Sequence, residues 1–288
     1  MRALEEAPDD DELIHADGDL QPTKATIGEK IARRKRKADK FCSKFCFTLW
    51  ILTPSIVQTC CLYLQEMINI YIVGRSGDFV FVDVVAMSNI LLYFGVFGTA
   101  IVFNSVLETL VPHALATNRV ELAGHILNRG LFIWSVLFGG FVALAFNSGL
   151  LLTQLLGQDE EDAYLTQEYL IHLLPSLWFW GICDAYRRFF NSFHKFWTPC
   201  LTYVFTIVVV HPIACYQAVE VYGMGAKGLA LAGFGTNFLT YLILRVISHT
   251  NVRMRPASFF PTFKTCCNIC QYLYYGIPQL IMFWIDTW

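Results

Sequence analysis

The chain has 288 residues, of which 55% are hydrophobic and 15% are charged, and its formal net charge is −2 at pH 7. Soluble domains carry about 25% charged residues, so this composition excludes an ordinary soluble domain. The charges crowd into the N-terminal segment and into short stretches between long apolar runs, a pattern typical of membrane-spanning helices.

The N-terminal segment is polar, first acidic over residues 5–19 and then basic over residues 30–37. It contains no apolar run like that of a signal peptide. With too few apolar side chains to form a core, residues 1–44 are predicted to be a disordered cytoplasmic tail. The basic run adjoins the first apolar segment, which favours a topology signal over a nucleic-acid-binding segment. No nucleic-acid partner is therefore expected.

Long apolar runs follow, and each complete run exceeds the ~20 residues that cross the ~30 Å hydrocarbon layer of a bilayer. Helices are expected because they pair all their backbone groups internally. The predicted spans are residues 46–73, 84–114, 131–156, 169–190, 197–219 and 228–247, with a seventh that begins near Gln271. The predicted fold is an all-α membrane bundle with a six-helix lobe over residues 45–248, a cytoplasmic loop over 249–270 and a truncated seventh helix over 271–288.

Basic residues indicate the orientation of these spans. With the N-terminus in the cytoplasm, 19 of the 21 Lys and Arg residues fall on the inner side, and only Arg75 and Lys227 fall outside. This distribution follows the positive-inside rule. The acidic loop over residues 157–162 then lies outside.

Polar residues inside a span are candidates for function, because an ionisable group there costs about 2.5–3.5 kcal/mol or more. Glu66 lies deep in the first span. Gln58, Gln65 and Asn69 share one helical face at spacing i, i+7 and i+11, and Glu66 is one step round from Gln65. So polar a face must look into the bundle or a cavity. Glu66, with Gln65 and Asn69 beside it, is a candidate for substrate or proton binding. The competing explanation is interhelical hydrogen bonding, which is favoured for the glutamines and the asparagine.

Asp286 is the second candidate carboxylate, in the apolar run that begins the seventh span. Nothing in residues 282–288 neutralises it. A buried carboxylate can exchange a proton for a cation, and the neighbouring Trp284 and Trp288 could hold an organic cation on their ring faces. The competing explanation is a carboxylate at the membrane surface that pairs with a base elsewhere.

The other ionisable residues of the spans have simpler explanations. Glu108 and His113 lie near the inner end of the second span. They are either gate residues or structural residues. In the structural alternative Glu108 caps a helix or forms an ion pair, and His113 is a hydrated histidine at the membrane boundary. Asp184 is expected to pair with Arg187 and Arg188 at i+3 and i+4. His211 precedes a proline, and packing explains it. No catalytic or phosphate-binding motif occurs, so neither an enzyme nor an ATP-driven pump is expected, and no cofactor beyond a coupling ion. The Cys267-x-x-Cys270 spacing has no second ligand pair, so no metal site is expected.

Several ordered blocks resemble the multidrug-and-toxin-extrusion (MATE) family. They are Leu107-Glu108-Thr109-Leu110, Gly124 to Gly130, Leu155-Leu156-Gly157-Gln158-Asp159, Arg187-Arg188-Phe189-Phe190-Asn191, Gly225 to Ala232, and Gly276-Ile277-Pro278 with Met282, Asp286 and Trp288. A weak internal repeat, Thr53-Pro54 against Gly276-Ile277-Pro278, fits a transporter built from two like halves. The departures from the family pattern are His113, Ala116, Asn191, Phe193 and Asp286.

The resemblance implies two six-helix lobes around a central cavity, and export of organic cations in exchange for H⁺ or Na⁺. Asn69 stands where bacterial members carry an Asp, so the resemblance favours H⁺ coupling through Asp286. Family members have about twelve helices, so we expect a partial sequence whose C-terminal lobe is missing. The alternatives are a lipid-linked oligosaccharide flippase of the same superfamily and a half-length membrane protein that does not transport. The expected location is the plasma membrane or a vacuolar or endosomal membrane.

Overall fold

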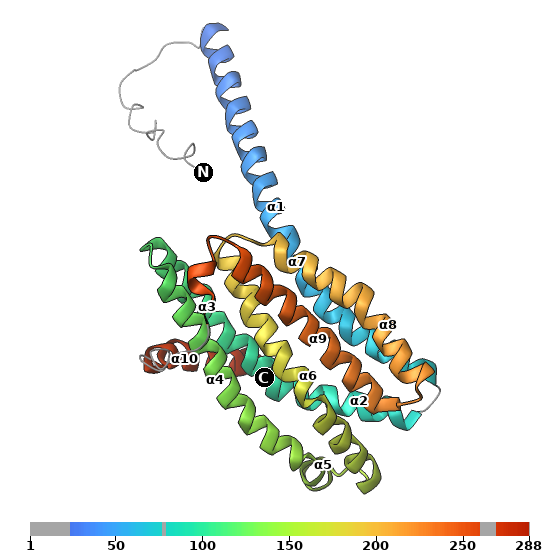
Figure 1. Ribbon diagram of the computed structural model, residues 1–288. Coiled ribbons are helices and arrows are strands. Elements are labelled where there is room, and N and C mark those ends of the chain that lie inside the picture. The colour runs from blue at the N-terminus through green and yellow to red at the C-terminus, as the bar shows by residue number, and fades with distance from the viewer. Residues whose placement is uncertain (1–23, 77–78, 260–268, 288) are drawn as a thin grey trace. The chain divides into compact units, whose positions relative to one another are not determined.

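The computed structural model describes residues 24–76, 79–259 and 269–287, nearly all of them in helices (Figure 1). It divides into two compact units, Met1–Leu52 and Thr53–Trp288. No strand occurs in the described ranges, in agreement with the predicted all-α class.

The helix α1 (Lys24–Ser76) begins within the first unit. The sequence predicted a disordered tail through residue 44, whereas the structure is helical from Lys24 onward. Ala, Glu, Lys and Arg make up most of residues 24–40, and they are among the strongest helix formers. Extending a helix that the following apolar segment already forms also avoids the cost of nucleation. Residues 1–23 lie outside the described residues.

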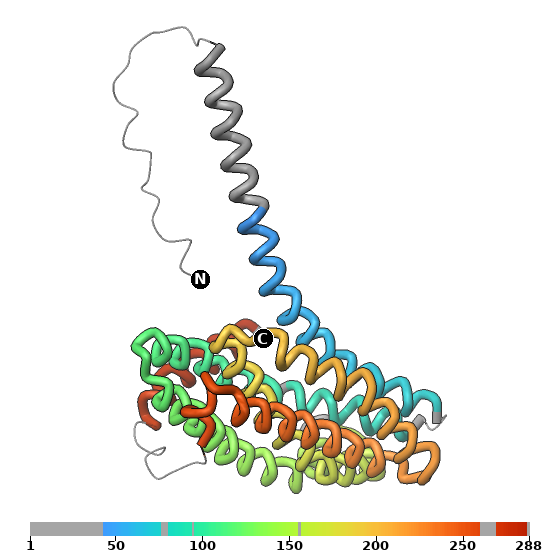
Figure 2. Tube along the Cα trace, turned by 45° about the horizontal axis from the view of Figure 1, so that its top comes forward, coloured from blue at the N-terminus to red at the C-terminus, as the bar shows by residue number. Residues whose placement is uncertain are grey.

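The second unit is a bundle of helices in which several long runs are interrupted by π-helical turns. After α1, its elements are α2 (Phe79–Leu92), η2 (Tyr93–Phe97), α3 (Gly98–Ala116), α4 (Val120–Phe146), α5 (Ser148–Leu156), α6 (Glu160–Ser192), α7 (Trp197–Tyr203), η3 (Val204–Val210), α8 (His211–Tyr216), η4 (Gln217–Val221), α9 (Gly225–Thr250), η5 (Arg255–Ala257) and α10 (Ile269–Thr287). The segments α2–η2–α3 and α7–η3–α8–η4 each run on as one continuous helix (Figure 2).

Five helical runs among the described residues are long and apolar enough to cross a membrane. They are Ser43–Arg75, Val80–Ala116, Val120–Phe146, Trp197–Val221 and Gly225–Thr250. The chain is therefore a multi-pass membrane protein, and the predicted number of six spans stays a prediction.

The predicted fourth span corresponds to α6, whose 33 residues extend about 50 Å at 1.5 Å per residue. This helix is the centre of the bundle, because α2, α3, α4, α5 and α9 all pack against it. Its polar side chains Ser176, Asp184 and Arg188 are buried, so they face other helices. A central position explains how so polar a helix is accommodated.

The third predicted span differs from the structure. The sequence predicted one helix over residues 131–156, whereas α4 begins at Val120 and ends at Phe146 and α5 is a separate short helix. The break is at Asn147, which has φ −109° and ψ 8°. Its amide donates to the Ala143 carbonyl at 2.8 Å, and Ser148 donates to the Ala145 carbonyl at 2.8 Å. These side-chain bonds to the backbone compete with the helical hydrogen bonds. The sequence prediction missed the break because the surrounding run is apolar.

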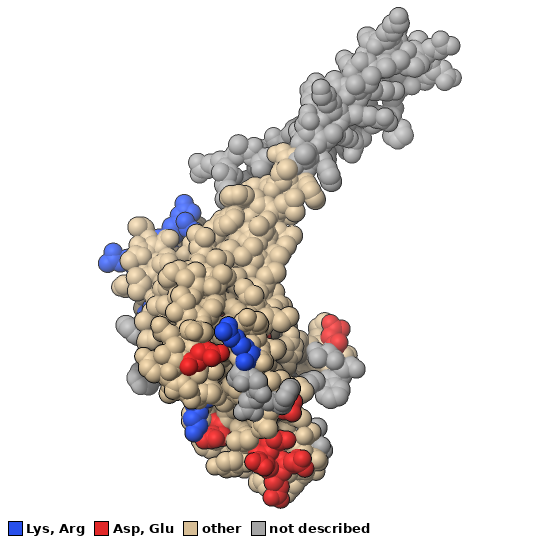
Figure 3. Space-filling view, turned by 90° about the vertical axis from the view of Figure 1, so that its right-hand side faces the viewer, with Lys and Arg blue, Asp and Glu red and all other residues tan. Residues whose placement is uncertain are grey.

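One end of the bundle is acidic. This end holds the start of α6, with Glu160, Glu161 and Asp162 in its first turn. Figure 3 shows a largely uncharged face with acidic side chains gathered at one end. Both basic residues that the sequence placed on the outer side form ion pairs, Arg75 with Glu220 at 3.7 Å and Lys227 with Glu168 at 2.7 Å.

Close packing between α4 and α6 depends on Gly181. The indole of Trp134 is fully buried and donates from Nε1 to the Trp178 carbonyl at 3.1 Å. A Cβ atom at Gly181 would lie 2.2 Å from the Trp134 ring. Only glycine therefore leaves room for this ring at the helix contact.

Substituting Gly181→Ala is expected to lower the thermal midpoint of the protein in detergent, because overpacking of a core costs about 1–3 kcal/mol. Gly139→Ala is the matched control, since a Cβ there has nothing within 4 Å. Thermal unfolding followed by tryptophan fluorescence measures both. Equal midpoints for Gly181→Ala and Gly139→Ala would contradict the packing assignment.

Candidate functional site

An open cavity of about 260 Å³ lies among α1, η2, α3 and α6. Its lining residues are Thr59, Leu62, Tyr63, Glu66, Tyr93, Phe97, Ile101, Trp180, Asp184, Arg187 and Arg188. Aromatic rings and charged side chains therefore share one space, which is the usual make-up of a small-molecule site.

The aromatic part of the cavity is ordered by ring contacts. The Phe97 and Trp180 rings meet edge to face with centroids 4.5 Å apart, and Tyr93 contacts Phe97 at 6.1 Å. Tyr93 is also hydrogen-bonded to Tyr63 of α1. Tyr93 and Phe97 are the first and last residues of the π-helical segment η2. Such segments often occur at functional sites, because the wider turn redirects side chains.

Glu66 lies at the boundary between this cavity and a smaller pocket of about 20 Å³. The smaller pocket, here called the inner pocket, is lined by Gln65, Glu66, Asn69, Asn89, Leu92, Phe97, Tyr169, Leu173, Ser176, Leu177, Trp180, Leu229, Gly233 and Asn237. Because a water needs about 10–15 Å³ of such space and several polar partners, the inner pocket has room for one water.

A buried polar network continues from Asn69. The Asn69 Oδ1 atom lies 2.9 Å from Nε2 of His211, and the His211 Nδ1 atom lies 3.1 Å from the Thr236 hydroxyl. Thr236 and Thr240 lie on one face of α9, and Thr240 donates to the Thr206 hydroxyl at 2.9 Å. The network joins α1, η3, α8 and α9.

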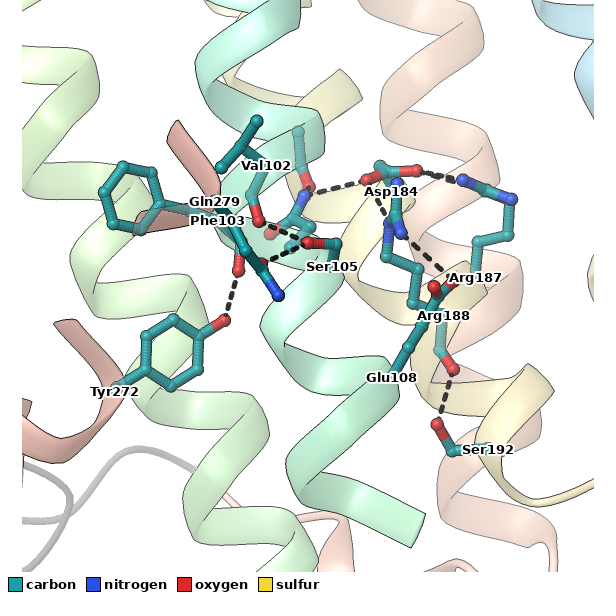
Figure 4. Close-up of polar contacts among 12 residues, drawn as sticks. Val102, Phe103, Ser105, Glu108, Asp184, Arg187, Arg188, Ser192, Tyr272 and Gln279 are labelled. Atoms are coloured by element: carbon teal, nitrogen blue, oxygen red, sulfur yellow. Dashed lines mark hydrogen bonds and ion pairs between the residues drawn. The ribbon is translucent and has the colours of Figure 1, made fainter. Parts of the chain in front are cut away.

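A second polar cluster centres on Asp184 and forms one wall of the cavity (Figure 4). Arg187 donates to its Oδ1 atom at 3.0 Å and 2.6 Å, and Arg188 donates from Nε to Oδ2 at 2.9 Å. Asn104 of α3 adds a bond to Oδ2 at 3.0 Å. The carboxylate is 2% exposed and is fully compensated, which confirms the ion pair expected from the spacing.

Arg188 also pairs with Glu108 of α3 at 3.0 Å. Two further bonds tie α3 to α10: Ser105 donates to the Gln279 side chain at 2.7 Å, and the Tyr272 hydroxyl donates to the Phe103 carbonyl at 2.7 Å (Figure 4). Three successive α3 residues, from Phe103 to Ser105, thus connect α10 to the Asp184 cluster.

The structure brings together only some of the candidate site residues that were predicted from the sequence. Gln65, Glu66 and Asn69 surround the inner pocket, and Gln58 is fully buried and donates to the Phe196 carbonyl at 2.8 Å. The polar face of α1 therefore does look into the bundle.

The remaining selected residues lie elsewhere. Glu108 belongs to the Asp184 cluster, whereas the His113 side chain is exposed near the end of α3. Asp286 is exposed near the end of α10, Trp284 is half-buried, and neither lines the two cavities. Trp288 and Cys267 lie outside the described residues.

Sequence reasoning missed the aromatic lining and the role of His211. Packing was the favoured explanation for His211, but both its ring nitrogens have polar partners. The signals available were its position in an apolar run and the polar threonines spaced four apart at 236 and 240. Asn104, another polar residue in an apolar run, also escaped notice.

The fold and the site define a multi-pass helical membrane protein with an internal cavity lined by aromatic and charged side chains. The family model described as MatE matches residues 54–217. The chain belongs to the MatE family.

Relatives and solved structures agree with this assignment. Protein DETOXIFICATION 16 of Arabidopsis thaliana is 22% identical over 246 residues, covering 83% of this chain and 49% of the relative. Protein DETOXIFICATION 1 of the same plant is 24% identical over 247 residues, with coverage of 83% and 49%. The solved eukaryotic MATE transporter AtDTX14 is similar with a TM-score of 0.77 and 21% identity, over 83% of this chain and 53% of that structure. The Vibrio cholerae MATE transporter VcmN in its bent form has a TM-score of 0.70 and 16% identity, with coverage of 83% and 53%. The chain spans about half the length of the relatives it matches.

Substituting Asp184→Asn is expected to destabilise the bundle strongly. Removing one partner of a buried ion pair costs about 3–5 kcal/mol. Arg187 would lose its ion-pair partner, and Arg188 would keep only Glu108. Thermal unfolding in detergent measures the effect. The matched control is Glu168→Gln, which removes an exposed pair with Lys227 and should change the midpoint little. A midpoint for Asp184→Asn as high as that of the control would contradict the role given to the cluster.

Proposed function

We propose that the chain forms one lobe of a secondary antiporter that exports organic cations and other xenobiotics in exchange for H⁺. The observation that carries this proposal is Glu66, a carboxylate at the edge of an aromatic cavity within an apolar bundle. None of the salt bridges in the described part of the chain includes Glu66. The negative charge of Glu66 is therefore available to a cationic ligand.

The chemistry of the cavity suits an organic cation. The ring faces of Trp180, Tyr93 and Tyr63 are attractive to a cation, at about 0.5–2 kcal/mol each. A carboxylate supplies the opposite charge, and the apolar wall at Leu62 and Ile101 fits an amphiphilic molecule. The relatives are named Protein DETOXIFICATION 16 and Protein DETOXIFICATION 1, and these names agree with export of foreign compounds.

Proton exchange follows from the cost of leaving a charge uncompensated. When the organic cation leaves, the charge of the carboxylate must be compensated again, because an isolated charge in apolar surroundings is unfavourable by several kcal/mol. A proton, on the carboxylate or on a base near it, is the simplest replacement. Cation and proton then compete to compensate one negative charge, and this competition couples their movement in opposite directions.

Alternating access requires a second lobe. The match covers 49% of each of these relatives, and transporters of this kind rock two like halves against each other. We propose that a second lobe closes the cavity on its open side, and that the N-terminus is cytoplasmic in a plasma, vacuolar or endosomal membrane. Asp286, implied by the family resemblance, is a second carboxylate of the same pathway.

The flippase alternative is less well supported by the charges that line the cavity. Such a protein would need a basic cavity to hold a lipid-linked phosphate. Arg187 and Arg188 do line the cavity, but both donate to Asp184, and Arg188 also pairs with Glu108. Their charges are already used within the protein, which leaves Glu66 as the carboxylate without an ion-pair partner among the described residues.

Substituting Glu66→Gln is expected to weaken binding of tetraphenylphosphonium, a lipophilic cation, to the purified chain in lipid nanodiscs by at least about tenfold, or about 1.4 kcal/mol. Equilibrium binding of the radiolabelled cation measures this. Glu121→Gln, an exposed glutamate in the first turn of α4, is the matched control and should bind as the wild type does. Unchanged affinity in Glu66→Gln would overturn the proposed site.

Substituting Asp286→Asn is expected to weaken binding to the purified chain less than Glu66→Gln does, because Asp286 is exposed and does not line the cavity. The same binding measurement ranks the two carboxylates. A larger loss for Asp286→Asn would place the cation site at α10 and contradict the assignment to Glu66.

A further inference from the structure

His211 is a fully buried ionisable group that the proposed site does not use. Its side chain is 0% exposed, in the middle of a helix that crosses the bundle. The π-helical segment η3 ends immediately before it, and Pro212 follows. Because proline lacks an N–H group and clashes with the preceding turn, it favours the wider turn that directs His211 inward.

The hydrogen bonds around His211 can satisfy two protonation states. In both states Nε2 carries a hydrogen, because its partner, the Asn69 carbonyl oxygen at 2.9 Å, can only accept. When Nδ1 is unprotonated, the Thr236 hydroxyl can donate to it across 3.1 Å. When Nδ1 is protonated, it donates to the same hydroxyl, which turns to donate to the Ala232 carbonyl at 2.9 Å. A rotating hydroxyl thus accommodates either form without leaving a buried group unpaired.

Asn69 connects this histidine to the cavity. Its amide carbonyl accepts from His211, and its side chain is also hydrogen-bonded to Glu66. A carboxylate, an amide and an imidazole therefore form one continuous chain from the cavity to the bundle interior. The other titratable groups nearby are neutral: the Cys215 thiol, 3.5 Å from Nε2, and the Tyr169 phenol, which interacts with both Glu66 and Cys215.

We propose that His211 is a proton-binding site that balances the charge of Glu66, so that binding of an organic cation at Glu66 releases the proton from His211. This inference rests on the proposed function. In the empty cavity, the Glu66 carboxylate and the His211 imidazolium sum to zero charge. With a cation bound, the cation and the carboxylate sum to zero and His211 is neutral. Both states avoid an uncompensated charge in an apolar bundle.

The released proton leaves Nδ1 of His211 as the imidazolium becomes neutral, because Nε2 carries a hydrogen in both states. No covalent bond other than N–H is broken, and water takes up the proton. Asn69 and Glu66 both line the inner pocket, which has room for one water between the network and the open cavity. A proton carried by Glu66 alone would need no histidine, so the protonation state of His211 separates the two schemes.

The test is nitrogen NMR of histidine-labelled chain in lipid nanodiscs, at about pH 6.5, the ordinary pKa of histidine. Imidazolium and neutral imidazole give distinct signals, and the spectrum of His211→Gln identifies the signal of His211. His172→Gln is the matched control for loss of a histidine, because His172 is exposed and its hydrogen bond is to the Glu168 carbonyl of its own helix. Tetraphenylphosphonium is the cation probe.

The expected result is an imidazolium at His211 in the empty protein that becomes neutral when the probe binds. In Glu66→Gln the imidazolium fraction should be at least about tenfold smaller even without probe, because the balancing charge is gone. If His211→Gln does not fold, Thr236→Val identifies the signal instead, since it removes the acceptor of Nδ1 and should also reduce the imidazolium.

The outcomes separate this inference from the proposed function. If the probe binds in a Glu66-dependent manner while His211 stays neutral throughout, the inference is overturned and the proposed function stands. If the probe does not bind, the proposed function fails. The comparison of wild type with Glu66→Gln then still decides whether His211 and Glu66 share charge. Equal imidazolium fractions in these two proteins overturn the inference.

Discussion

Charge compensation inside an apolar bundle is the constraint on which the rest of this structure depends. A carboxylate or guanidinium away from water is tolerated only when an opposite charge or several hydrogen bonds lie within reach. Asp184 meets this condition with two arginines and an asparagine. Glu66 meets it only in part, through the Asn69 amide. The difference between these two acidic residues separates a structural element from a candidate binding site.

The same helices that satisfy Asp184 also shape the cavity. Central α6 supplies Trp180 and the arginine pair, and α3 supplies Asn104 and Glu108. Phe103 and Ser105 of α3 are hydrogen-bonded to α10. A shift of α10 would therefore displace the part of α3 that carries Asn104, which is bonded to Asp184. These polar contacts join α3, α6 and α10 into one connected network.

Much of the fold was predictable, because each long apolar run has to become a helix in lipid. The local ion pair of Asp184 was also predictable, since spacing along one helix fixes which side chains meet. The break at Asn147 was not, because it depends on side-chain bonds to the backbone within an otherwise apolar run. The helix over residues 24–44 was not predicted, because the prediction of a disordered tail considered the charge of this segment and not its helix propensity.

The candidate site was harder to predict for a related reason. Position along α1 placed Glu66, Gln65 and Asn69 together, but His211 lies 142 residues from Asn69 in the chain. Contacts between distant helices depend on how the helices pack and on π-helical turns such as η2 and η3, which a single sequence does not reveal. Asp286 stood out in the sequence as an acid in an apolar run, yet its side chain is exposed in the structure.

The claim that an organic cation is held beside Glu66 is tested most directly by photocrosslinking. A light-activated phosphonium cation would be bound to the purified chain in nanodiscs, and the labelled peptides would be mapped with and without excess unlabelled cation. Label on the cavity-lining segments of α1 and α6, near Tyr63 and Trp180, that disappears under competition is the predicted result. Competable label on α10 alone, or on lipid-facing positions, would contradict it.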